Sequence, residues 1–239
     1  MIHGTNTSQR LHESLGEIIA STLPGGRLPS EPELARRFSV SRATLREAMR
    51  TFETQGLIRR RQGSGTFVVH PTHVIESGLE ILESIETMAK RIGLPVSMGD
   101  LKIVHRPVTP DEAHNLGVLA DSRIIHLSRV ILAEGRPAAY LIDIVPDEIL
   151  SLHELEENFT GSVLDLLIHR NEPELLTSRC EINADTASPE VARSLGIQRG
   201  DVLLRFVAYL FDTSGRVVDY SISYFLPGYF RFHVVRRVG

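Results

Sequence analysis

The first 55 residues place apolar side chains every three or four positions, which is the spacing of one face of a helix. Three groups of this kind predict three short helices. The groups are Leu11, Leu15, Ile18 and Ile19; then Leu34, Ala35 and Phe38; and then Leu45, Ala48, Met49 and Phe52. Pro24-Gly25-Gly26 separates the first two groups, and Ser39-Val40 forms a tight turn between the second and the third. The last two helices therefore read as a helix-turn-helix.

Residues that favour helix N-termini stand before each group. Thr7 or Ser8 can cap the first helix, and Ser41 can cap the third. Ser30 and Glu33 have the spacing of a capping box, in which the hydroxyl accepts a backbone N–H and the carboxylate reaches back to the cap. These residues predict where each helix begins.

A basic hairpin follows the third helix, which ends at Gln55-Gly56. Its central residues are Arg59-Arg60-Arg61-Gln62-Gly63-Ser64-Gly65-Thr66. Glycines at the tip allow the backbone to lie against a phosphate or a minor-groove wall. Three helices and this wing together predict a winged helix-turn-helix, a module that reads duplex DNA.

The outer face of the third helix carries candidate base contacts. Arg42, Thr44, Arg46 and Arg50 project away from the apolar stripe. In the major groove an arginine can form a bidentate pair with guanine, worth about 1–3 kcal/mol of base discrimination. The alternative, for an isolated arginine-rich helix, is a solvated basic face. The capped partner helix, the turn and the basic hairpin favour DNA binding here.

Another pattern begins near residue 93, where one unit of strands and a short helix occurs twice. Residues 109–118 match residues 188–197 at an offset of 79, and residues 135–143 match residues 215–223 at an offset of 80. Each copy predicts a strand, a helix with Ser or Thr at its N-cap and Pro in its first turn, and a hairpin. The alternative is a likeness that reflects only recurring hairpin chemistry. A true duplication predicts a two-lobed sheet with a cleft where the lobes meet.

The strands of this region are rich in Val, Ile, Phe and Tyr. They cover residues 124–132, 138–145, 202–211 and 217–226. Such strands suit an antiparallel sheet with one face covered by helices. An apolar stripe from Leu79 to Ile92 predicts an amphipathic helix between the two regions. The expected fold class is α+β, with a DNA-binding domain at 1–70, a linker helix at 71–92 and a sheet domain at 93–239.

Charge divides along the same boundary. Residues 1–70 carry ten arginines and six acidic residues, a net +4, whereas the remainder carries 16 basic and 24 acidic residues, a net −8. A basic head on an acidic body confines nucleic acid to one end. The single Cys180 excludes an internal disulfide and a cysteine-based zinc site, and we expect neither metal nor cofactor. Without a signal-like N-terminus or a run of 18 apolar residues, we expect a soluble, cytoplasmic protein.

The head resembles the DNA-binding domain of GntR-family transcription regulators. The resemblance rests on the segments LPSE, LARRFSVSRATLREA and GLIRRRQGSGTFV. It implies that the third helix contacts operator bases or phosphates and that the wing tip lies on the DNA. The DNA-binding residues expected are Ser41, Arg42, Ala43, Thr44, Arg46, Arg50, Arg60, Gln62 and Gly63. Many members have an arginine where this chain has Pro32, so we expect one backbone contact to be missing.

Residues 93–237 resemble the effector-binding UTRA domain of the HutC subfamily. The motifs are the LG(V/I) turns, the strand–xGxP–strand hairpin and the closing aromatic strand. The resemblance implies a chorismate-lyase-like fold, a homodimer and a small-molecule pocket on the sheet, with ligand binding altering how the two heads sit on DNA. The effector-binding residues expected are Ser97, Arg129, Leu141, Asp143, Ser162, Asp219 and Phe225.

Two departures at the pocket positions shape the expected effector. Members that bind sugar phosphates have a second arginine where this chain has Ile131, and a glutamate where it has Leu141. Their absence removes a phosphate clamp and a sugar-hydroxyl acceptor together. The sequence therefore predicts an effector less polar than a sugar phosphate, with at most one acidic group such as a carboxylate, held by Arg129. The alternative for Arg129 is a structural salt bridge to an acid such as Asp143.

The resemblance implies a metabolite-responsive repressor that binds a palindromic operator as a homodimer, and two other classes compete with it. One is an enzyme, because the fold resembles chorismate lyase. No two histidines of the body have metal-ligand spacing, however, and no nucleophile elbow or phosphate loop is present. The other is an architectural DNA binder, although a duplicated, cleft-forming domain is more than dimerisation requires.

Overall fold

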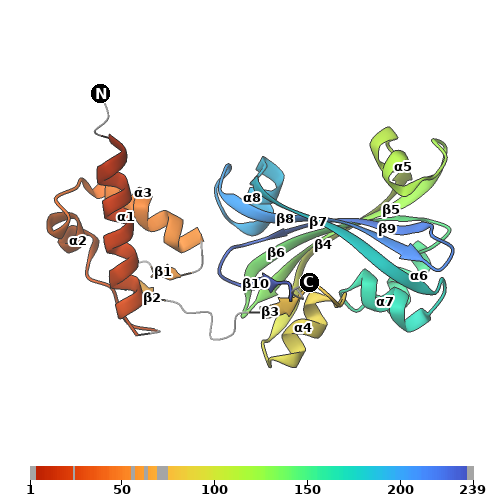
Figure 1. Cartoon of the computed structure of the whole chain (residues 1–239), viewed down its shortest axis with the longest axis horizontal. Coiled ribbons are helices and arrows are strands. Elements are labelled where there is room, and N and C mark those ends of the chain that lie inside the picture. The colour runs from red at the N-terminus through yellow and green to blue at the C-terminus, as the bar shows by residue number, and fades with distance from the viewer. Residues whose placement is uncertain (1–3, 24, 55–56, 62–63, 69–74, 236–239) are drawn as a thin grey trace. The chain divides into compact units, whose positions relative to one another are not determined.

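The chain was analysed as a computed structural model that describes residues 4–23, 25–54, 57–61, 64–68 and 75–235 (Figure 1). It divides into two compact units. The first comprises Met1–Val74 and Leu226–Tyr229, and the second comprises Ile75–Phe225 and Phe230–Gly239. The first boundary therefore falls after Val74, close to the predicted end of the DNA-binding domain.

The first unit contains three helices followed by a hairpin. Its elements are α1 (Gly4–Ser21), α2 (Glu31–Arg37), α3 (Arg42–Thr54), β1 (Ile58–Arg61) and β2 (Gly65–Val68). β1 and β2 pair antiparallel. Leu15, Leu34, Leu45 and Met49 are fully buried in one cluster, so the three apolar stripes form a single core. The winged helix-turn-helix architecture is confirmed.

The predicted helix starts are right for α2 and α3 and wrong for α1, although the capping box predicted for α2 does not form. The N–H of Thr44 donates to Ser41 Oγ at 3.0 Å, so Ser41 caps α3 as expected. Ser30 is the N-cap residue of α2, but its hydroxyl forms no capping bond, and the Ser30 carbonyl accepts the Leu34 N–H at 2.9 Å. Thr7 and Ser8 do not cap α1, because the helical backbone continues through them to Gly4.

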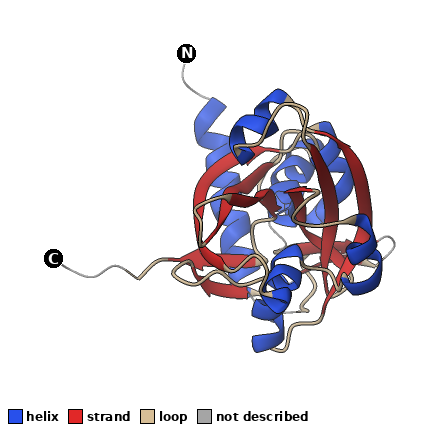
Figure 2. Cartoon of the chain, turned by 90° about the vertical axis from the view of Figure 1, so that its right-hand side faces the viewer, coloured by secondary structure: helices blue, strands red, loops and turns tan. Residues whose placement is uncertain are grey.

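The second unit is built on a six-stranded antiparallel sheet with the strand order β4-β5-β6-β9-β8-β7. The strands are β4 (Val96–Pro107), β5 (Arg123–Ala133), β6 (Arg136–Pro146), β7 (Leu175–Thr186), β8 (Val202–Asp212) and β9 (Val217–Phe225). Figure 2 shows these long strands curving rather than lying flat. The twist that antiparallel strands adopt explains this shape.

The strand order reflects the duplication. β4, β5 and β6 form one half of the sheet, and β7, β8 and β9 form the other half in reverse order. Ile142 on β6 pairs with Ile222 on β9, and these two positions are equivalent at the offset of 80. The short helix of each copy ends at a left-handed glycine, Gly117 (φ 67°) and Gly196 (φ 64°). The recurring pattern therefore marks a repeated structural unit with a pseudo-twofold axis between Ile142 and Ile222.

Helices lie on both faces of the sheet, whereas we expected them on one. The helices are α4 (Ile85–Arg91), α5 (Pro110–Leu116), α6 (Leu152–Asn158), α7 (Val163–Arg170) and α8 (Pro189–Leu195). In Figure 1, α5 and α8 lie on one face and α4, α6 and α7 on the other. The central strands β5 and β6 are buried at almost every position, which requires cover on both sides.

The predicted linker helix is much shorter than its apolar stripe. Only Ile85–Arg91 is helical, and the Ser84 hydroxyl caps it by accepting the Thr87 N–H at 3.0 Å. The residues before it include a strand, β3 (Ile75–Gly78), which pairs parallel with β10 (Phe230–His233). The prediction of a helix from Leu79 is therefore wrong, because β3 before it pairs with a strand more than 150 residues away, and the Leu79 N–H donates to the His233 carbonyl of that strand at 3.0 Å.

The core between the sheet and α6 and α7 gives a first testable prediction. Leu127 on β5 is fully buried in this core, whereas Leu119 is 75% exposed. Replacing Leu127 with Ala should lower the free energy of unfolding by about 2–5 kcal/mol, because the cavity left behind adds to the lost burial. Urea unfolding of Leu119→Ala, the matched control, should differ little from the native chain. Equal stability of the two variants would contradict this placement of the core.

Candidate DNA-binding surface and ligand cavity

The outer face of α3 presents the predicted DNA contacts to solvent. Four of them, Arg42, Ala43, Thr44 and Arg46, are exposed, and Arg50 is half-buried. Their neighbours Leu45 and Met49 face the core and are fully buried. The helix is therefore fixed by its inner stripe, and its outer side chains are available to a partner.

An acidic residue that sequence reasoning missed connects this face to the wing strand. Glu31, at the start of α2, accepts Arg46 Nε at 2.7 Å and lies 3.5 Å from Arg60 Nε. Arg60 on β1 also lies 3.9 Å from Glu53. The Arg46 side chain remains 61% exposed in this arrangement. Glu31 therefore orients two of the predicted DNA-binding arginines, one from α3 and one from the hairpin.

Two predicted DNA contacts at the wing tip, Gln62 and Gly63, lie outside the described residues. The strands on either side of them are described, with Arg61 opposite Gly65 in the register. The role of the wing tip stays a prediction from the sequence.

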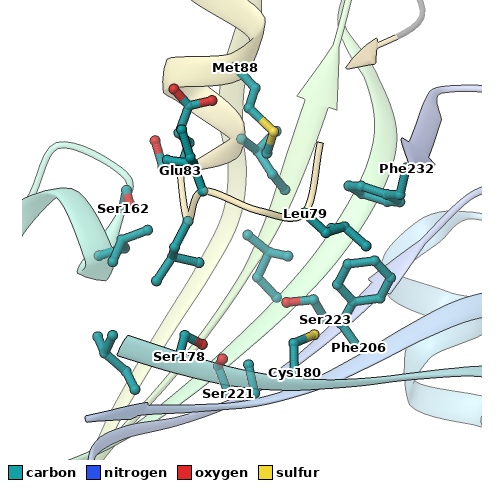
Figure 3. Close-up of a pocket in the computed structure, with 18 of the residues that line it drawn as sticks. Leu79, Glu83, Met88, Ser162, Ser178, Cys180, Phe206, Ser221, Ser223 and Phe232 are labelled. Atoms are coloured by element: carbon teal, nitrogen blue, oxygen red, sulfur yellow. The ribbon is translucent and has the colours of Figure 1, made fainter. Parts of the chain in front are cut away.

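A cavity of about 590 Å³ lies in the second unit, on the face of the sheet that carries α4 and α7 (Figure 3). Its volume is within the usual range for small-molecule sites. Six of the seven predicted effector positions line it: Arg129, Leu141, Asp143, Ser162, Asp219 and Phe225. Ser97 does not line it, and this residue is exposed on the edge strand β4. The structure thus brings together six of the seven predicted residues.

The strand register explains the floor of the cavity. Asp219, Ser221, Ser223 and Phe225 alternate along β9, so all four lie on one face of the sheet. Opposite residues on neighbouring strands share that face. Leu210 lies beside Asp219; Ala208 and Asp143 lie beside Ser221; Phe206 and Leu141 lie beside Ser223. Along β9, the floor therefore changes from carboxyl groups through hydroxyls to aromatic rings.

The roof of the cavity is the segment that we expected to be helical. Leu79, Ile81 and Leu82 line the cavity although each is at least one-third exposed, and Met88 of α4 joins them. Figure 3 shows Leu79 and Met88 across the cavity from Ser221 and Cys180 on the sheet. One signal in the sequence could have indicated this role, namely an apolar run that continues upstream of the Ser84 cap.

The guanidinium of Arg129 is already paired inside the cavity. Arg129 Nη1 donates to Asp143 Oδ2, and the side chains of both residues are almost completely buried. This is the structural salt bridge that sequence analysis raised as the alternative to a ligand contact. An acidic effector would therefore have to share Arg129 with Asp143.

Two further carboxyl groups lie close to this ion pair. Burial raises the pKa of Asp219 well above its ordinary value; the neighbouring Asp143 adds to the increase and Arg129 opposes it. Burial also raises the pKa of Glu86 on α4, again opposed by Arg129. Sequence reasoning missed Glu86, because it lies in the presumed linker rather than on the sheet.

Several polar atoms at this end of the cavity are buried without a partner among the described residues. They are both carboxyl oxygens of Glu86, Asp219 Oδ1 and Arg129 Nε. A buried polar group that lacks a hydrogen bond destabilises a protein by about 1–3 kcal/mol. A polar ligand that donates hydrogen bonds to the carboxyl oxygens would remove part of this cost, which would contribute to its binding free energy.

Ser162, another predicted effector position, has a local structural role. It is the N-cap of α7, and its hydroxyl accepts the Asp165 N–H at 3.1 Å. Asp165 in turn accepts the Ser84 hydroxyl at 2.7 Å, which ties α7 to the start of α4. Ser162 therefore helps to fix the roof of the cavity.

The described residues contain neither a candidate metal site nor a candidate membrane-spanning helix. No group of three or more His, Cys, Asp and Glu side chains there is arranged to hold a metal ion. None of the helices described is both long enough and apolar enough to cross a membrane.

Comparison with known proteins assigns both units. Residues 7–68 match the model of bacterial regulatory proteins, gntR family, and residues 93–231 match the model of the UTRA domain. The chain is 31% identical to the HTH-type transcriptional repressor NagR of Bacillus subtilis, over 88% of this chain and 86% of NagR. It is 24% identical to the mannosyl-D-glycerate transport/metabolism system repressor MngR of Escherichia coli, over 90% and 88% of the two chains. The crystal structure of PhnF from Mycobacterium smegmatis has the same fold, with a TM-score of 0.62 at 21% identity, over 96% of this chain and 100% of PhnF.

Proposed function

This chain belongs to the GntR family of bacterial regulatory proteins and carries a UTRA domain, and on that premise we propose that it is a metabolite-responsive repressor. The family makes it a DNA-binding transcriptional regulator and not an enzyme, and a GntR head followed by a UTRA domain is the architecture of the HutC subfamily. Two of its relatives, NagR and MngR, are named repressors. We propose that this protein also represses transcription and that a small molecule controls its repression.

DNA reading is assigned to α3 and the wing. Arg42, Thr44 and Arg46 enter the major groove, where the arginines read guanine and the threonine hydroxyl adds a contact. Arg50 and Arg60 bind phosphates, which position the head without reading sequence. The exposed outer face of α3, held on its buried inner stripe, is the observation that supports this assignment.

We propose that the protein binds a palindromic operator as a homodimer. A single head offers few contacts, whereas a twofold dimer places two α3 helices at half-sites about one helical turn apart. Binding by both heads then gains avidity of about 100- to 10,000-fold over one head. Any change that separates the heads by the wrong distance removes this gain.

The cavity of the second unit is the effector site in this proposal, and it is the observation that favours a sensor over a purely architectural DNA binder. An effector that binds better to the dimer with misaligned heads shifts the population toward that state by its differential affinity. We propose an effector less polar than a sugar phosphate, because the cavity holds a single arginine, which is already paired.

Operator binding tests the proposed function directly. A labelled duplex with two half-sites selected from random DNA is compared with the same duplex after one half-site is scrambled. We expect fluorescence anisotropy to give a Kd about 100- to 10,000-fold weaker for the scrambled duplex. Equal affinities would contradict the dimeric reading, and an absence of sequence preference would contradict regulation through an operator.

A further inference from the structure

The polar end of the cavity contains one cation and three carboxyl groups. The cation is Arg129 on β5, and the carboxyl groups are Glu86 on α4, Asp143 on β6 and Asp219 on β9. Because Arg129 pairs with Asp143, neither Glu86 nor Asp219 has its charge compensated by a guanidinium hydrogen bond among the described contacts. The cavity therefore has an excess of acceptors and of potential negative charge.

The unpartnered atoms specify what a ligand must supply. Three of the four that line the cavity are carboxyl oxygens, from Glu86 and Asp219, and Asp219 is only 5% exposed. A ligand carboxylate or phosphate would place further acceptors and a further negative charge against them. A ligand ammonium would instead donate hydrogen bonds and compensate the charge, and such charge-assisted bonds are about twice as strong as neutral ones.

The far end of the cavity suits an apolar group. Phe206, Phe225 and Phe232 line it and contact one another, with ring centroids 4.6–5.0 Å apart. Figure 3 shows Phe206 and Phe232 beside Leu79. Along β9, Asp219 lies four residues before Ser223, the residue that pairs with Phe206, which is a rise of about 13 Å. The hydrogen bond to the carboxylate, a short aliphatic chain and the contact with the ring can together span that distance.

We propose that the cavity binds an organic amine whose ammonium group is held by Glu86 and Asp219 and whose apolar part packs on Phe206, Phe225 and Phe232. The inference rests on the proposed function, since it names the class of effector that the second unit recognises. The sequence predicted an effector with at most one acidic group, held by Arg129. The inference proposes a basic effector instead, because Arg129 is already paired with Asp143 and is not free to bind an acid.

Three compounds with one skeleton test the inference. The full chain is titrated by calorimetry with 4-phenylbutylamine, 4-phenylbutyrate and 4-phenylbutan-1-ol, which differ only in the head group. We expect the amine to bind at least about tenfold more tightly than the other two. Preference for the acid or the alcohol, saturable binding of none of the three, or displacement of the amine by calcium would overturn the inference.

Isosteric variants locate the ammonium site. Glu86→Gln and Asp219→Asn should each weaken 4-phenylbutylamine by about 10- to 100-fold, the effect of losing a hydrogen bond to a charged group. Glu83→Gln is the matched control, because Glu83 lines the same cavity but its carboxylate already binds Arg91 at 2.7 Å. If Glu83→Gln weakens the amine as much as Glu86→Gln, general negative potential explains the binding and the proposed site is wrong.

Proton exchange on binding gives a second readout whose sign separates amine from acid. The titratable groups that line the cavity are Glu80 and Glu83 of the roof, Glu86 of α4, Arg129, Asp143, Cys180 of β7 and Asp219, and the charge of Asp165 on α7 also acts on Glu86. Burial raises the pKa values of Glu86 and Asp219, so a bound ammonium favours their ionised forms and releases protons. Affinity for the amine should therefore rise as the pH increases from the ordinary range of carboxyl pKa values through the raised pKa values of these two groups. Proton uptake, or affinity that falls with pH, would overturn the assignment.

These outcomes remain distinct from failure of the proposed function. If the chain binds an operator and only a non-amine compound releases it, the regulator stands and the ligand class is wrong. If the chain binds the amine but no operator, the ligand class stands and the regulator is wrong.

Discussion

Arg129→Met is expected to lower the free energy of unfolding of the second unit by about 3–5 kcal/mol. The substitution removes the cation that pairs with buried Asp143, which lies beside Asp219, a carboxyl group whose pKa is already raised by burial. A buried carboxylate without a partner must either remain charged in an apolar environment or take up a proton. Urea unfolding can be followed by tyrosine fluorescence, since the chain has no Trp and four of its five Tyr residues lie in β6, β8 and β9.

The double variant Arg129→Met, Asp143→Asn separates loss of the pair from loss of one partner. Because both charges are gone, we expect it to recover much of the stability that the single variant loses, as buried ion pairs often do. A single variant as stable as the native chain would indicate that Arg129 is held for a ligand and not for the fold. A double variant no better than the single one would show that packing of the arginine stem matters more than its charge.

Local patterns in the sequence predicted the winged helix-turn-helix and the repeated strand-helix-hairpin unit, but not the helices on the second face of the sheet. These patterns are the three apolar stripes of the head and the repeated Ser/Thr-Pro helix starts. Each of them involves residues that are close together in the sequence, within one or two helical turns. The roof of the cavity does not, because β3 becomes a strand only by pairing with β10 at the other end of the chain. Leu79 and Leu82 therefore satisfy a helical period by sequence while they lie outside any helix.

The candidate sites show the same division. Six of the predicted cavity residues come from the sheet or the start of α7, where a recurring frame fixes their positions. Ser97 was wrongly predicted to line the cavity, because it lies exposed on the edge strand β4. Glu86 was missed because only the folded chain brings α4 over the sheet. In the head, the outer face of α3 followed from periodicity alone, whereas the contact of Glu31 with Arg46 joins residues 15 positions apart and has no local signature.

Arg46→Ala should weaken operator binding by about 1–3 kcal/mol for each half-site, or roughly 5- to 150-fold, and relax the preference for guanine at one position. The physical reason is that the exposed guanidinium, oriented through its Nε by Glu31, can direct its remaining donors to a base edge. Anisotropy titrations against the operator, and against duplexes with that position changed, measure both effects.

The matched control is Arg37→Ala, which removes another exposed arginine, from the last turn of α2. Because Arg37 lies outside the predicted reading face, its loss should lower affinity for every duplex alike, by no more than a single phosphate contact. Salt dependence also distinguishes base contacts from phosphate contacts. Loss of one phosphate contact reduces the slope of log K against log salt concentration by about one, whatever the DNA sequence. Base preference that survives in Arg46→Ala but is lost in Arg37→Ala would assign reading to α2 and remove α3 from the groove.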